Sequence, residues 1–139
     1  MKQPSDRRQL SLVSDAREFS MGWRIWMWLL MLVNLIAPLF FPREPEAWAA
    51  LGSYFLAAAV IIPLHRRLGW VRILGVGHFP WLGLLPWLYT RLLSGSPAGA
   101  LRIWIIVTLV VNTTCLAIDI VDICRYLAGD RAPIVPRRG

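Results

Sequence analysis

The sequence predicts an all-α integral membrane protein, a bundle of four transmembrane helices whose amino and carboxy termini both lie in the cytoplasm. Three observations lead to this fold class: the composition, four long apolar segments and a one-sided distribution of basic residues. Of the 139 residues, 57% are hydrophobic, and the mean hydropathy is +0.54. Such a chain is too apolar for an ordinary soluble domain, whose helices keep a polar face for water.

Four apolar segments have the length that a membrane-spanning helix requires. A helix needs about 20 mostly apolar residues to cross the hydrocarbon, because no water is present there to satisfy its backbone. The predicted spans cover residues 24–41, 47–64, 71–93 and 101–124.

Little of the sequence remains outside these spans, so residues 1–139 are predicted to form a single membrane domain. An amino-terminal cytoplasmic tail takes up 1–22, the four-helix region 23–128, and a basic cytoplasmic tail 129–139. Gly129 is placed to end the last helix, because glycine is the residue most often found just after a helix carboxy terminus.

The basic residues lie mostly on one side of the predicted bundle. If successive helices alternate in direction, only Arg43, Arg91 and Arg102 of the 15 lysines and arginines face away from the side that holds both termini. Loops rich in lysine and arginine stay in the cytoplasm, so we expect that side to be cytoplasmic, in a bacterial inner membrane. The net charge of +7 then matches anionic lipid headgroups, and we expect no nucleic-acid partner.

The third predicted span is interrupted by proline and glycine. Pro80 and Pro86 each lack a backbone donor and displace the carbonyl four residues earlier in a helix. In lipid those carbonyls must find a partner in the protein, in water or in a ligand. We therefore predict that the third helix is kinked by Pro80 and Pro86 and that it faces other helices.

Asp119, Asp122 and His78 form the candidate polar site. The two aspartates are three residues apart near the end of the last apolar segment, so they share one helix face. His78 lies at a similar predicted depth to Asp119, and an imidazole–carboxylate pair of this kind can relay protons or bind a metal. The simpler alternatives are an ion-pair cluster that locks the helix ends and a neutral, hydrogen-bonded core histidine.

Other basic side chains lie on the same predicted membrane side and are candidates for contact with headgroups or a partner protein. These residues are His65, Arg66, Arg67, Arg72 and Arg125. A haem held between His65 and His78 is disfavoured, because their predicted depths differ by about five helical residues. We expect no cofactor, and the sequence assigns no catalytic or metal-binding residue.

Amide and sulfur side chains also fall within the spans. Asn34 and Asn112 lie in the middle of the first and fourth spans, where interhelical hydrogen bonds more often fix packing than line a pathway. Cys115 and Cys124 lie on one predicted helix, nine residues apart, which is too far for a disulfide. Both cysteines are interpreted as packing residues.

No motif in the sequence names a reaction, a substrate or a partner. The sequence favours a non-enzymatic role, as a structural or interaction subunit, or scaffold, of a membrane complex that packs against other membrane proteins or against copies of itself. The alternative is a small proton- or cation-coupled transporter or channel that works as an oligomer. An enzyme acting on lipid headgroups or quinones at the cytoplasmic boundary is the third and least favoured hypothesis.

Overall fold

The computed structural model describes residues 19–132 and 134, and all regular structure in this part of the chain is helical. The amino-terminal tail before residue 19, and residues 133 and 135–139 of the predicted basic tail, lie outside the described residues. The elements in chain order are α2 (Met21–Met31), η1 (Leu32–Ile36), η2 (Ala37–Phe40), α3 (Pro45–Leu68), η3 (Arg72–His78), α4 (Trp81–Leu93) and α5 (Gly99–Leu127).

Three helical stretches are long and apolar enough to cross a membrane: Met21–Phe40, Pro45–Leu68 and Gly99–Leu127. They correspond to the first, second and fourth predicted spans. The last of them, α5, has 29 residues and is therefore about 43 Å long, more than the roughly 30 Å of hydrocarbon. It ends at Leu127, and Gly129 adopts a positive φ of 111° just beyond it, as the sequence predicts.

The segment predicted as the third span consists of two helical pieces. A 3-10 helix, η3, is followed by the 13-residue α-helix α4, and Pro80 lies at the junction. The carbonyl of Val76, which Pro80 deprives of its α-helical partner, accepts from the backbone N–H of Phe79 at 3.2 Å. Pro86 lies inside α4.

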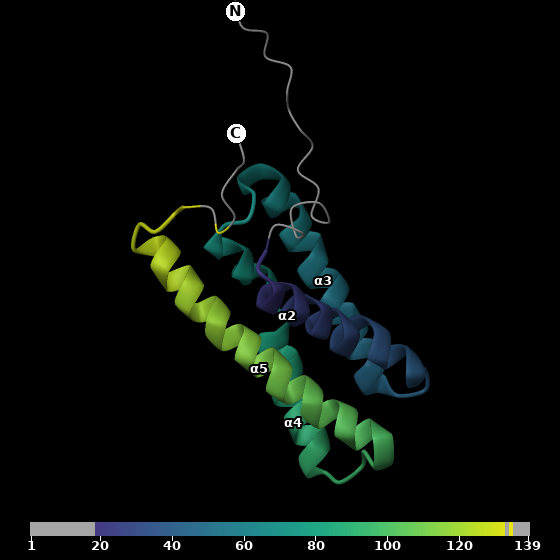
Figure 1. The fold of residues 1–139 in the computed structure, drawn as a ribbon. Helices are drawn as coiled ribbons and strands as arrows, with labels where there is room; N and C mark the ends of the chain where they lie inside the picture. The colour runs from purple at the N-terminus through teal and green to yellow at the C-terminus, as the bar shows by residue number, and fades with distance from the viewer. Residues whose placement is uncertain (1–18, 133, 135–139) are drawn as a thin grey trace, which may run out of the picture.

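Contacts at the two ends of the bundle show that successive helices alternate in direction (Figure 1). The ring of Phe19, just before α2, lies 4.9 Å from that of Trp70 in the α3–η3 turn. The backbone N–H of Ile134, beyond α5, donates to the carbonyl of Trp70 at the same end. At the opposite end, Arg91 Nε donates to Glu46 Oε1 at 2.6 Å and joins the end of α4 to the start of α3.

The η3 helix lies between α3 and α5 and approaches both closely through glycines. A Cβ atom added at Gly75 would lie 2.6 Å from Asp119 Oδ1 on α5, and one added at Gly77 would overlap the side chain of Ile61 on α3. Real Cβ atoms do not approach other atoms this closely. Glycine at these two positions is therefore what allows η3 to fit between the longer helices.

Irregular helical turns in the first span free backbone and side-chain groups that α5 then satisfies. In the π-helical turn η1 the N–H of Ala37 donates to the carbonyl of Leu32, and Pro38 has no N–H. Neither the α-helical nor the π-helical donor is therefore available to the carbonyl of Val33. Trp104 Nε1 on α5 donates to that carbonyl at 3.0 Å.

The two mid-span amides bond to each other. Asn34 Nδ2 donates to Asn112 Oδ1 at 2.8 Å, and Asn112 Nδ2 donates to Asn34 Oδ1 at 2.7 Å. Both side chains are fully buried. The predicted packing role of these amides is confirmed, because they cross-link the first and last spans.

Apolar side chains cover much of the outside of the helices as well as the interior. Phe40, Leu82 and Val110 are 78%, 63% and 62% exposed, respectively. In water such a surface would be unfavourable, whereas in a bilayer it faces lipid tails. The buried core that holds the helices together is made of Ala47, Ala50, Trp81, Leu84, Leu85, Leu88, Trp104, Ile105 and Cys115.

Candidate functional site

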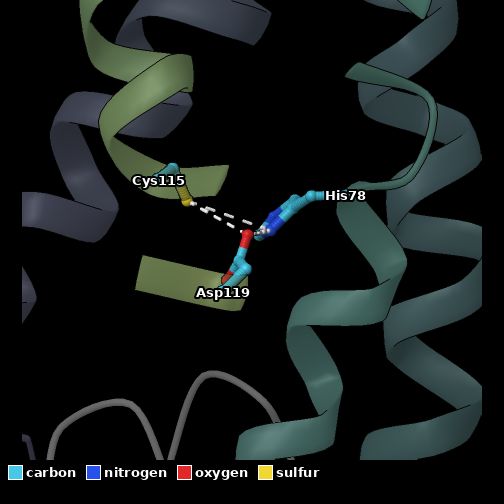
Figure 2. A group of neighbouring side chains, drawn as sticks. All are labelled: His78, Cys115 and Asp119. Atoms are coloured by element: carbon cyan, nitrogen blue, oxygen red, sulfur yellow. Dashed lines mark hydrogen bonds and ion pairs between the residues drawn. The ribbon is translucent and has the colours of Figure 1, made fainter. Parts of the chain in front are cut away.

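Two segments bring an imidazole, a thiol and a carboxylate together inside the bundle. His78 is the last residue of η3, and Cys115 and Asp119 lie one turn apart on the same face of α5. His78 Nδ1 is 2.8 Å from Asp119 Oδ2, and Cys115 Sγ is 3.7 Å from that oxygen and 3.9 Å from that nitrogen. Figure 2 shows the three side chains converging from the two segments.

Neighbouring groups hold the imidazole and the carboxylate in place. The ring of Trp81 stacks on the ring of His78, with centroids 4.3 Å apart and planes 12° from parallel. Asp119 Oδ1 points at Gly75, so Oδ2 faces the imidazole and the thiol. Cys115 is buried, whereas the side chains of His78 and Asp119 keep 19% and 14% exposure, respectively.

The predicted site is therefore divided in the structure. Asp119 and His78 are in direct contact, but Asp122 joins a different group of charges. Asp122 Oδ1 lies 3.9 Å from Arg72 Nη1, near the α3–η3 turn. The two aspartates share a helix face, as their spacing predicts. They have separate partners, because the imidazole of His78 contacts only the carboxylate of Asp119.

The second group of charges is an ion-pair network at the end of α5. Arg72 Nε donates to Asp130 Oδ2 at 3.1 Å, and Arg125 Nη2 donates to the same oxygen at 3.0 Å. The hydrogen bond from Arg72, and more weakly that from Arg125, holds the pKa of the Asp130 carboxyl below its ordinary value. This network ties the α3–η3 turn to the segment that follows α5.

The other residues predicted to contact headgroups or a partner differ in their exposure. Arg66 and Arg67 are exposed, which suits the predicted contact with headgroups or a partner. His65 is fully buried, with its ring 5.0 Å from the ring of Trp70; this burial disfavours the predicted headgroup contact, which stays a prediction. Trp70, in the turn after α3, contacts His65, and hydropathy does not predict this contact.

The structure contains two polar contacts that the sequence does not predict. The sequence predicts only a packing role for Cys115, although its position four residues before Asp119 indicates that both side chains face the same way. The pairing of buried Glu46 with Arg91 joins the first turn of α3 to the last turn of α4, and no sequence pattern predicts it.

The fold and the site define a small helical membrane protein with a polar cluster inside the bundle. No protein-family model, curated protein or solved structure matches the chain.

The close approach of η3 to α5 leads to a first prediction. Gly75→Ala places a methyl group against Asp119, so we expect it to destabilise the bundle by about 1–3 kcal/mol, the usual cost of overpacking a close contact. Gly83→Ala is the matched control, because nothing lies within 4 Å of the added Cβ. Reversible unfolding in mixed detergent micelles measures both variants, and equal stability of the two would show that the contact does not limit the packing.

Proposed function

We propose that the chain crosses the membrane four times, with both termini in the cytoplasm and with η3 and α4 together forming the third, broken span. The 7 residues of η3 and the 13 of α4 have a combined helical length of about 34 Å, enough for a hydrocarbon layer of about 30 Å. Bends at Pro80 and Pro86 accompany this crossing.

The distribution of arginine supports this orientation. Arg66, Arg67 and Arg125 are exposed at the end of the bundle that also holds the start of α2. Arg43 and Arg91 lie at the opposite end, and Arg91 is paired with buried Glu46. The end with more exposed arginine faces the cytoplasm by the positive-inside rule.

Accessibility to a membrane-impermeant maleimide tests the topology in intact cells. In a Cys124→Ser background, Glu44→Cys and Ser94→Cys are expected to react from outside the cell, whereas Arg131→Cys reacts only after the membrane is opened. Cys124 is replaced because it is exposed, while Cys115 is buried. Protection of positions 44 and 94 in intact cells, with labelling of position 131, would show that the orientation is the opposite of the one proposed.

We propose that the protein functions as a structural or interaction subunit of a membrane complex. The observation that carries this proposal is the use of the polar side chains within the spans. Asn34 pairs with Asn112 and Asp119 with His78, so these groups lock the bundle internally. The outer surface is apolar and suits contact with lipid or with other transmembrane helices.

An apolar groove between α4 and α5 supports the same proposal. Small and hydroxyl-bearing residues in such a groove favour close approach of a helix, and the groove carries Ala117, Thr113 and Thr114. Its other lining residues include Leu85, Pro86, Tyr89, Ile106 and Val110.

Mass measurement in mild detergent tests the interaction. The wild-type chain is expected to run as an assembly containing more than one 15.8 kDa polypeptide, composed of copies of itself or of a second membrane protein. Ala117→Trp fills the groove and should lower the assembled fraction at least about tenfold, the effect of roughly 1.4 kcal/mol. Ala59→Trp, at an exposed position on α3, is the control. A stable wild-type monomer with no partner would contradict the proposal.

The contact between His78 and Asp119 favours a second function, that of a proton- or cation-coupled transporter. An imidazole–carboxylate pair inside a bundle is a common element of proton pathways, and the broken third span supplies a hinge beside it.

Flux measurements in proteoliposomes test the second function. Asp119→Asn is expected to abolish proton flux, whereas Asp122→Asn should leave it nearly unchanged, because Asp122 pairs with Arg72 outside the contact. Helical content and detergent-resistant folding are measured for both variants. Unchanged flux in a folded Asp119→Asn variant, or no flux in the wild type, would contradict this second proposed function.

A further inference from the structure

We propose that His78 Nδ1, Cys115 Sγ and Asp119 Oδ2 form a binding site for a divalent transition-metal ion of the Zn²⁺ class. This inference concerns binding alone and requires neither transport nor assembly with a partner.

The donor atoms match the chemistry of such ions. Zn²⁺ is bound in proteins by imidazole nitrogen, thiolate sulfur and carboxylate oxygen, and the cluster supplies one of each. A thiolate and an imidazole disfavour Mg²⁺ and Ca²⁺, which take oxygen ligands. The donor set therefore selects a borderline or soft ion rather than a hard one.

The three donor atoms are already close to the spacing that coordination needs. With zinc bonds of about 2.0–2.3 Å and tetrahedral angles, neighbouring ligand atoms lie about 3.4–3.6 Å apart. The observed separations are 2.8 Å for N and O, 3.7 Å for S and O, and 3.9 Å for S and N. The separation of each pair of donor atoms therefore has to change by only about 0.1–0.6 Å, and side-chain rotations can provide this change without moving a helix.

Charge balance favours the ion in this environment. A divalent cation bound by the Cys115 thiolate, the Asp119 carboxylate and neutral imidazole makes a cluster of zero net charge, which costs least to bury in a medium of low dielectric constant. Coordination replaces the hydrogen on Sγ and any hydrogen on Nδ1, and these protons leave to the solvent or, for the imidazole, move to Nε2.

Neighbouring residues orient the proposed ligands, as the residues around known metal ligands do. The stacked ring of Trp81 fixes the plane of the imidazole, and the close backbone of Gly75 fixes the rotation of the carboxylate. Ordered ligands reduce the entropy lost on binding. The partial exposure of His78 and Asp119 leaves an approach for the ion and for a water molecule as fourth ligand.

Cobalt(II) is the probe, because a tetrahedral Co²⁺ site with a thiolate ligand has intense ligand-field bands and a sulfur-to-cobalt charge-transfer band. The full chain is purified in detergent, stripped with a chelator and titrated with Co²⁺. We expect both sets of bands to saturate at one ion per chain, and Zn²⁺ to displace the Co²⁺. A wild-type spectrum identical to that of hydrated Co²⁺ overturns the proposal and leaves a cluster held by hydrogen bonds alone.

Variants assign the ligands. Cys115→Ser should remove the charge-transfer band, and Asp119→Asn should weaken Zn²⁺ binding by at least about 100-fold, the upper end of the loss seen when only an outer partner of a ligand is removed. Cys124→Ser is the matched control, because this exposed cysteine lies on the same helix and is expected to leave the spectrum unchanged.

Two further outcomes separate this site from the other proposals. Loss of the band in Cys124→Ser with retention in Cys115→Ser would place the ion at the exposed thiol and overturn the assignment. Saturable Co²⁺ binding in a protein that shows no flux and runs as a monomer would support the metal site while contradicting both functions proposed above.

Discussion

The close approach of η3 to α3 and α5 is the contact on which the rest of the arrangement depends. It is possible only because Gly75 and Gly77 have no side chain at the two points of contact. Pro80 is the N-cap residue of α4, and the carbonyl of Val76, which Pro80 deprives of a donor, accepts instead from the N–H of Phe79. The same approach brings the end of η3 to the face of α5 that carries the polar cluster.

A second constraint acts on every polar group in the spans, because hydrocarbon offers no water as a substitute partner. Several of the described polar groups meet it by pairing between helices, whereas the buried Nε1 of Trp81 has no hydrogen-bond partner. The carbonyl that Pro38 leaves unpaired accepts from Trp104, the two asparagines bond to each other, and Glu46 pairs with Arg91. These contacts join η1 to α5 and the start of α3 to the end of α4, so the same hydrogen bonds satisfy polar groups and hold the helices together.

The polar cluster occupies the junction between a broken helix and a continuous one. A broken helix allows the His78 ring to project across to α5, and the continuous helix presents Cys115 and Asp119 one turn apart. The ion pairs of Arg72 with Asp122 and Asp130 lie nearby and close this end of the bundle. Packed groups on both sides of the three donor atoms suit the cation site that we propose.

The sequence by itself determined the helical class, the apolar segments, the one-sided arginines and the shared face of Asp119 and Asp122, because these follow from composition and helical period. It also indicated the contact between His78 and Asp119 through their similar depths. Only the tertiary structure decided that Asp122 turns to Arg72, that His65 is buried, that Cys115 joins the cluster, and that the third segment divides into η3 and α4. Those outcomes depend on which helix faces meet, and hydropathy and spacing along one helix carry no information about the rotation of its neighbours.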